Sequence, residues 1–470
     1  MLFFGFRYLA FFLFITSLLS FMNIIYSYYF NFFLNLNNYI FTLFLSLILG
    51  SIFFLKKKKN TDFKINIYGK ILTVLSGYIL IPLIFSLPFY LSVYNFTLLD
   101  SFFESISGFT STGFSIIENI KNYDESLIIW RSTTQWIGGL YFLFSIVLLI
   151  DIFDDNLKKS LTNFLSFNTS ETVKQSIKIF LMYTVLTVIL FLIFNIFEFR
   201  SFISLNLSLT FISSGGFLPV NSFSNIATTN LKELVLAFSM LISFFSIFLS
   251  YNLFFKKNRS LNFFQEDIYL LIYLIFLIAV FFIFLNFEND FSRILLLISS
   301  CISNIGVSLN DTPENLSLIF LILVIIGGSF FSTSSGIRFL KLFAMFRFSI
   351  NNLISHAKPK NIYVDKHFIF EISYKKHEIN KYFLSILIFI ISIFILSSLL
   401  TLSNIHFENA IKLSVLTLMN TVNSSMYGLG DLNFGEMSII TKYYLIFFMI
   451  IGRVELLTLL IILKKFLFKY

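Results

Sequence analysis

The sequence predicts an all-α polytopic membrane protein. Of its 470 residues, 57% are hydrophobic and only 13% are charged, which is about half the charged share of an ordinary globular domain. Apolar runs long enough to cross a bilayer recur along the whole chain. Too few charged residues remain to cover a soluble protein of this size, so a soluble enzyme and a nucleic-acid-binding protein are excluded as leading interpretations.

Ten membrane spans are expected. Most of the apolar runs contain the roughly 20 residues that cross the hydrocarbon core, and the longer ones have room to tilt or break. The single cysteine, Cys301, excludes an intramolecular disulfide. The spans are expected near residues 2–22, 38–55, 67–93, 128–150, 177–198, 231–255, 268–287, 317–346, 381–402 and 438–464.

Basic residues orient these spans. The net charge is +9, and the main basic stretches are Lys56–Lys59, Lys158–Lys159, Lys256–Arg259 and the long polar segment 338–381. All of them fall on one side of the predicted topology, which is therefore the cytoplasmic side and carries both termini. The same residues suit contact with anionic membrane lipid. The opposite side is acidic and is expected to attract cations.

A shorter segment recurs four times between the spans. Each copy begins apolar and ends in Ser, Thr or Asn with Gly, so the pattern is helix, short re-entrant helix, glycine-bearing strand, helix. Alignment of the copies places Gly113, Gly216, Gly306 and Gly428 in one column. An alternative alignment of the fourth copy places Met426 in that column.

This pattern predicts a cation filter. Non-helical backbone survives at membrane depth only where protein buries it or where it lines a watery path. Four such strands around an axis can turn carbonyl oxygens toward a dehydrated cation, and glycine permits the backbone conformations that this needs. The predicted ion-binding residues are Ser111, Thr112, Gly113, Ser214, Gly215, Gly216, Asn304, Ile305, Gly306, Met426, Tyr427 and Gly428.

Two further features suggest a gate. Glycine, serine and threonine interrupt the span near 317–346, which predicts an intramembrane loop beneath the filter, with a kink at a packing site as the alternative. Arg453 lies within the last span, where a cationic side chain would raise a barrier to cations, unless it pairs with an acid such as Glu455. The predicted gate residues are Gly327, Gly328, Ser332, Thr333, Gly336 and Arg453.

These motifs resemble the Trk/Ktr/HKT superfamily of potassium transporters, and specifically its membrane subunit. The run DSFFESISGFTSTG at Asp100–Gly113 is similar to the family's first pore segment, and Trp130–Gly139 to the helix that follows it. The segment Gly327–Arg338 resembles the broken helix of the third repeat, and Gly452–Glu455 the closing motif. Tyr141, Phe330 and Phe331 depart from the smaller residues usual in the family.

The resemblance implies four M1–pore helix–M2 repeats around a pseudo-fourfold axis, plus two N-terminal helices. It implies potassium uptake across the cytoplasmic (inner) membrane, a homodimer, and regulation by separate cytoplasmic nucleotide-binding subunits. A glycine in the first filter strand goes with potassium in this family, and a serine with sodium in some members. The chain then divides into a helix pair at 1–60, repeats at 61–155, 156–259 and 260–350, and a cytoplasmic connection with the fourth repeat at 351–470.

Other functions stay open as alternatives. A sodium or mixed sodium/potassium transporter of the same fold is the first. A polytopic membrane enzyme is the second, although no cluster of acids, histidines or basic residues converges at one interface. An organic-solute transporter would instead show inverted repeats. No phosphate-binding or dinucleotide motif occurs, so no cofactor and no metal are expected beyond the transported cation. Channel-like and ion-coupled transport are not distinguished.

Overall fold

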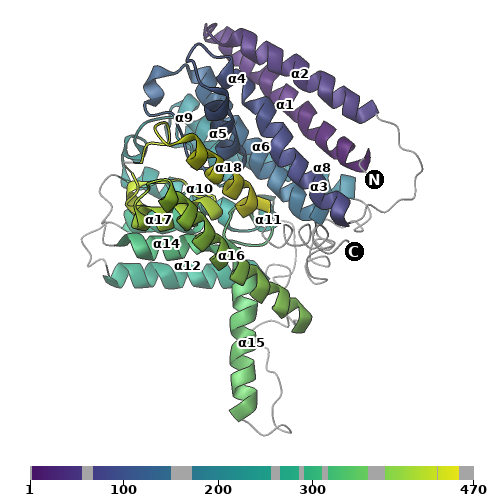
Figure 1. Ribbon diagram of the computed structural model, residues 1–470. Coiled ribbons are helices and arrows are strands. Elements are labelled where there is room, and N and C mark those ends of the chain that lie inside the picture. The colour runs from purple at the N-terminus through teal and green to yellow at the C-terminus, as the bar shows by residue number, and fades with distance from the viewer. Residues whose placement is uncertain are drawn as a thin grey trace.

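The computed structural model describes residues 3–55, 67–149, 172–255, 265–284, 291–309, 316–357, 376–430 and 432–454, and these are largely helical (Figure 1). Among them, seven stretches of helix are long and apolar enough to cross a membrane, so the chain is a multi-pass membrane protein. They comprise α1 (Phe3–Tyr29), α2 (Leu36–Leu55), α3 (Ile67–Phe85) continued by α4 (Leu87–Tyr90), α6 (Glu125–Leu149), α8 (Thr172–Ile196), α12 (Gln265–Phe284) and α16 (Lys376–Leu402).

Two of the expected spans are broken. The span near 231–255 divides into α10 (Asn230–Phe244) and α11 (Ile247–Phe255). The span near 317–346 divides into α14 (Ser317–Ile325) and α15 (Phe339–Ala357), which extends beyond the bundle (Figure 1). Between them, the two-residue strands β1 (Ile326–Gly327) and β2 (Ile337–Arg338) pair in parallel. The last span begins with α18 (Ile439–Val454).

Four short helices alternate with these spans and have the same length. These pore helices are α5 (Leu98–Phe109), α9 (Ser201–Ile212), α13 (Phe291–Ile302) and α17 (Phe407–Leu418), each of 12 residues. In three repeats the chain turns into the pore helix through a residue with positive φ, namely Asn95, Glu198 and Asn404. The order span, pore helix, span therefore occurs four times after α1 and α2, as predicted.

The N-terminal helices α1 and α2 are fastened to the beginning of α6 by polar contacts. Tyr26 Oη donates to Glu125 Oε2 (2.7 Å), and Asn35 Nδ2 donates to Asp124 Oδ1 (3.1 Å). Tyr94, in the loop before α5, also donates to Asp124 Oδ1 (3.1 Å). Burial raises the pKa of Tyr94 to about 12, so this phenol keeps its proton and remains a donor. The expected first span, 2–22, is too short because α1 continues to Tyr29.

Some predictions lie outside the described residues. These include the basic stretches Lys56–Lys59, Lys158–Lys159 and Lys256–Arg259, and most of the polar segment 338–381. Three of the four repeat boundaries, at residues 60, 155 and 259, also lie there. The fourth boundary, at residue 350, falls inside α15. The orientation and this division of the chain stay predictions.

A tyrosine fills the space that small residues leave between α3 and α6. Tyr141 Oη donates to the Val74 carbonyl (2.9 Å), and its ring packs edge-on against Tyr78 (centroids 5.0 Å apart). Gly77 makes room for it, because a methyl group there would lie 1.9 Å from Tyr141 Oη. The departure of Tyr141 from the family pattern is therefore accommodated by Gly77.

Gly77→Ala should lower the stability of the fold. Alanine is a better helix former than glycine by about 1 kcal/mol, yet the methyl group would displace Tyr141, and overpacking costs about 1–3 kcal/mol. Thermal unfolding in detergent should show a lower midpoint. Gly435→Ala is the matched control, because its nearest neighbour is the Asn433 side chain at 3.1 Å. An unchanged or higher midpoint for Gly77→Ala would contradict this packing.

Candidate ion-binding ring

The four pore helices end in the same way. Two residues after each helix the backbone takes a positive φ of about 48–60°, at Ser111, Ser214, Asn304 and Asn420. The following backbone N–H groups bond back into the last turn, as in Thr112 N to Ser107 O (2.9 Å) and Thr421 N to Leu416 O (3.0 Å). This geometry satisfies helix-end carbonyls and ends each helix abruptly. The four ring segments that follow are residues 111–113, 214–216, 304–306 and 420–422.

Side chains at the turning positions tie the ring segments to one another. Ser214 Oγ donates to the Ser303 carbonyl. Asn304 Nδ2 donates to Thr421 Oγ1 (3.2 Å). Asn420 Nδ2 donates to Thr112 Oγ1 (3.0 Å). These bonds connect the second segment to the third, the third to the fourth, and the fourth to the first.

The fourth residue after each helix completes a ring. A methyl group on Gly113 would lie 3.1 Å from Gly216 Cα, and one on Gly216 would lie 2.8 Å from the Ile305 carbonyl oxygen. A methyl group on Gly306 would lie 2.9 Å from the Val422 carbonyl oxygen. Gly113, Gly216, Gly306 and Val422 are therefore in close mutual contact. Substitution of the glycines is also restricted by φ, which is +82° at Gly113 and +77° at Gly306.

The predicted register of the fourth segment is wrong. Gly428 lies ten residues beyond α17, after a short 3₁₀ helix at Ser425–Tyr427, and the nearest atom to a methyl group there would be Lys412 Nζ at 3.3 Å. Met426 and Tyr427 are buried in the core, with Met426 Sδ 3.4 Å from Cys301 Sγ. The alignment relied on glycine, whereas here asparagine supplies the positive φ and valine takes the glycine position. Asn420, Thr421 and Val422 were missed.

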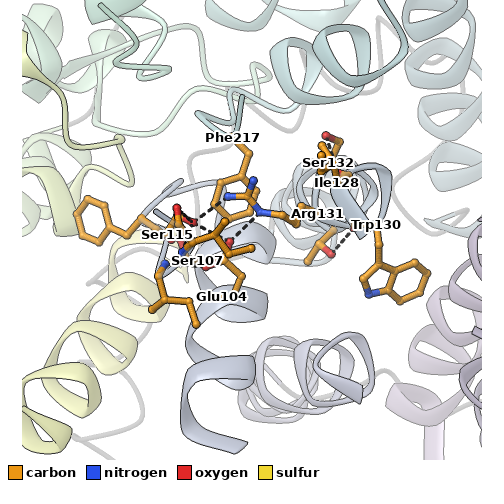
Figure 2. A network of polar contacts seen from close by, with 12 residues as sticks. Glu104, Ser107, Ser115, Ile128, Trp130, Arg131, Ser132 and Phe217 are labelled. Carbon is orange, nitrogen blue, oxygen red and sulfur yellow. Dashed lines mark hydrogen bonds and ion pairs between the residues drawn. The ribbon is translucent and has the colours of Figure 1, made fainter. Parts of the chain in front are cut away.

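An ion pair inside the protein holds the first pore helix (Figure 2). Arg131, from α6, donates through Nε to Glu104 Oε1 (2.8 Å) and through Nη2 to Ser115 Oγ (2.9 Å). Glu104 Oε2 accepts from the Ile116 backbone N–H (3.0 Å). Both charged side chains are at most 3% exposed. Each therefore has the other, and neighbouring polar groups, in place of the water that it loses on burial. Glu104 thus ties α5 to neighbouring backbone, as its position in the pore helix suggested.

The same face of α6 supports the second ring segment. The Arg131 guanidinium lies over the Phe217 ring, 4.2 Å from its centroid. In the amide orientation that satisfies its neighbours, the Gln135 side-chain oxygen accepts from Gly216 N (3.2 Å) and Phe217 N (3.1 Å). Through Arg131 and Gln135, α6 links pore helix α5 to the second ring segment.

The predicted gate loop spans residues 327–338, and its part between β1 and β2, residues 328–336, lies against the ends of pore helices. Thr333 Oγ1 donates to the Ile212 carbonyl at the end of α9 (2.7 Å). Ser335 Oγ lies 3.5 Å from Asn420 Oδ1 of the fourth ring segment. Ser332 Oγ donates to the Ser329 carbonyl (2.6 Å), an interaction within the loop itself. The interruption of 13 residues between α14 and α15 is therefore packed against the ends of pore helices rather than forming a simple kink.

Glycines close the base of this loop. A methyl group on Gly327 would lie 2.2 Å from the Ser335 carbonyl oxygen, and one on Gly328 would lie 2.2 Å from the Phe244 carbonyl oxygen. Gly336 has a φ of +81° and lies against Gly327. Phe331, which is larger than the residue usual in the family, packs against Phe248 (ring centroids 5.3 Å apart).

Arg453 bridges the loop and the ring. Its Nη1 donates to Ser335 Oγ, its Nη2 lies 3.4 Å from Ser111 Oγ, and its guanidinium lies 4.1 Å from the Phe142 ring centroid. The side chain is 2% exposed. Glu455, the alternative partner, lies outside the described residues.

Sequence analysis missed two adjacent carboxylates: the half-buried Glu266, which holds the loop, and the buried Asp267, which holds the neighbouring helix break. Glu266, in α12, accepts from Phe330 N (2.9 Å) and from Ser329 Oγ (3.2 Å). Asp267 accepts from Ser246 N (2.9 Å) at the break between α10 and α11. The signal available in the sequence was a pair of adjacent acids in the first turn of an apolar helix.

Three acidic side chains, at the beginnings of pore helices α5 and α17 and of α6, are paired. Asp100 bonds Lys442 Nζ (2.6 Å), Glu125 bonds Arg200 Nη2 (2.5 Å) and Glu408 bonds Lys412 Nζ (2.7 Å). The pairing reduces the field that these acids would exert on passing cations. The expected attraction of cations by an acidic surface therefore has less support than the ring itself.

This arrangement defines a class of protein: a polytopic helical membrane protein in which four pore helices and their ring segments surround one axis. Comparison with known proteins agrees. A crystal structure of the potassium transporter TrkH from Vibrio parahaemolyticus shares the fold, with a TM-score of 0.81, 20% identity and 97% of each chain covered.

Sequence comparison confirms the resemblance to the Trk/Ktr/HKT superfamily. The Trk system potassium uptake protein TrkH of Escherichia coli is 24% identical over 445 residues, 90% of each chain. An uncharacterized cation transporter of Methanocaldococcus jannaschii is 24% identical over 331 residues, 67% of this chain and 66% of that protein. No family model matches the chain.

Glu104→Gln should destabilise the protein strongly. It leaves the Arg131 charge buried without its partner, and breaking a buried pair costs about 3–5 kcal/mol. The midpoint of thermal unfolding should fall clearly. Glu408→Gln removes a pair whose carboxylate is 74% exposed, and it should lower the midpoint much less. Equal midpoints for the two variants would show that the buried pair does not hold α5.

Proposed function

We propose that this chain is the membrane subunit of a potassium uptake system of the inner membrane. The observation that carries the proposal is the mutual contact of Gly113, Gly216, Gly306 and Val422 at the ends of four pore helices. Names of relatives that describe potassium uptake support it.

The ring would select and pass dehydrated cations. Each pore helix directs its C-terminal end toward the ring, and helix C-termini carry partial negative charge. Carbonyl oxygens of the ring segments would replace the water lost by the cation. The proposed ion-binding residues are Ser111, Thr112, Gly113, Ser214, Gly215, Gly216, Asn304, Ile305 and Gly306, with Asn420, Thr421 and Val422 in the fourth segment.

The loop at 328–336 and Arg453 would form the gate. The loop would lie beneath the ring, because Thr333 contacts the end of α9 and Ser335 contacts the fourth ring segment. Arg453 places a buried positive charge near Ser111, which raises the energy of a cation in the same path. Movement of the loop would carry Ser335 away from both Asn420 and Arg453 and so open the path.

The remaining expectations belong to the same proposal. Both termini would be cytoplasmic, two copies would form a homodimer, and separate cytoplasmic nucleotide-binding subunits would regulate transport. The chain would divide into an N-terminal helix pair and four repeats. The motive force would be the membrane potential.

Sodium or mixed sodium/potassium transport is the second candidate. The observation that favours it is Val422, which breaks the ring of four glycines. The same uptake measurements with the two ions distinguish the candidates.

Growth of cells that lack their own potassium uptake systems tests the proposal. Expression of the chain, with candidate regulatory subunits, should restore growth at low potassium. Gly113→Asp should abolish rescue at equal expression, because its side chain would enter the closely packed ring. Gly435→Asp, at an exposed glycine outside the ring, should still rescue. Absence of rescue by the unaltered chain with its regulatory subunits would contradict potassium uptake.

Deletion of Phe330–Ser335 should increase cation flux. The glycines at the base of the loop, Gly327 and Gly336, are already in contact, so a shorter connection can close. Uptake should rise because Thr333 and Ser335 no longer lie beneath the ring. Thr333→Ser, which keeps the hydroxyl, serves as the control and should transport like the unaltered chain. Unchanged or lower uptake in a well-expressed deletion would argue against a gate.

A further inference from the structure

The fourth ring segment carries a side chain where the other three carry only a hydrogen. Val422 lies four residues after α17, as Gly113, Gly216 and Gly306 lie four residues after α5, α9 and α13. Val422 is half-buried, whereas the three glycines are buried. The ring is therefore asymmetric at the position where the four repeats approach one another closely.

The valine side chain lies within the ring. A methyl group on Gly216 would lie 2.5 Å from Val422 Cβ and 2.8 Å from its Cγ1. A methyl group on Gly113 would lie 3.1 Å from Val422 Cβ, and one on Gly306 would lie 3.2 Å from its Cγ1. One isopropyl group thus faces glycines from all three other repeats, so it does not point to the outer wall of the ring.

Such a group obstructs a cation in two ways. It occupies space on the path, and its carbons provide no oxygen to replace lost water. An ion beside apolar surface keeps its full cost of dehydration, and apolar constrictions block permeation for this reason. Backbone carbonyls of the same segment remain available, so the obstruction belongs to the side chain alone.

Other contacts hold the fourth segment in place without the valine side chain. Asn420 Nδ2 donates to Thr112 Oγ1 (3.0 Å) and to the Met449 carbonyl (2.9 Å). Thr421 accepts from Asn304 through Oγ1 (3.2 Å), and its N–H bonds Leu416 O (3.0 Å). Shortening Val422 should therefore change the volume on the path without dismantling the ring.

We propose that the Val422 side chain limits the rate at which cations pass the ring. The inference rests on the proposed transport function and adds a residue that determines the flux. The volume of the Val422 side chain, more than its lack of polarity, sets the limit, because the closest approaches of the three glycine positions are to its Cβ and Cγ1.

Cation flux into liposomes tests this role. The purified full-length chain and its variants, each together with the candidate regulatory subunits, are reconstituted into potassium-loaded liposomes, and the initial uptake of radioactive rubidium is measured. Val422→Gly should raise the rate at least about fivefold, equivalent to a modest lowering of the barrier. Val422→Ala should fall between the two, and Val422→Thr, which keeps the branched shape and adds a hydroxyl, should gain much less than Val422→Gly. Val220→Gly, at a half-buried valine beyond the second ring segment, controls for added glycine flexibility.

The outcomes separate this inference from the proposed function. If the unaltered chain transports rubidium but folded Val422→Gly and Val422→Ala are no faster, the side chain does not limit flux and the inference fails alone. If Val422→Gly does not fold, Val422→Ala decides. A rise in Val422→Thr as large as in Val422→Gly overturns the assignment to volume. If no form exceeds empty liposomes, while an added potassium ionophore does, both the inference and the transport function fail.

Discussion

Backbone that leaves the helical conformation within a membrane must have its polar groups satisfied by the protein itself. The structure meets this constraint at the four places where a pore helix stops. At each, a residue of positive φ reverses the chain and returns N–H groups to the last helical turn. Ser214, Asn304 and Asn420 then bond the neighbouring repeat. The close ring of Gly113, Gly216, Gly306 and Val422 depends on these turns.

The same constraint explains why the ring and the loop beneath it are connected. Asn420 bonds the first ring segment and α18, and it also meets Ser335 of the loop. Arg453 reaches both Ser335 and Ser111. On the opposite side Glu266 holds the loop through Phe330 N. A change at the loop therefore alters partners of the ring, which gives a physical route by which a gate and a filter act together.

The sequence predicted most of the architecture because its signals are local. Apolar runs marked the spans, and glycine beside Ser, Thr or Asn marked three ring segments in the correct register. The fourth was wrong because Asn420 and Val422 take the places that Ser111 and Gly113 have in the first repeat. The feature that identifies the fourth segment is its constant spacing along the chain from the end of a 12-residue pore helix. Tertiary partners such as Gln135 with Phe217 and Glu266 with Phe330 join residues far apart in sequence, so no local pattern reveals them.

Cation selection by this protein therefore depends on the backbone of four ring segments acting as one cation site. Anomalous X-ray scattering from crystals grown with rubidium tests this most directly, because it locates the ion independently of any assumed role. Anomalous peaks are expected on the axis that the ring surrounds, bordered by carbonyl oxygens of residues 111–113, 214–216, 304–306 and 420–422. Rubidium peaks that avoid this axis, with ordered ring segments, would contradict it.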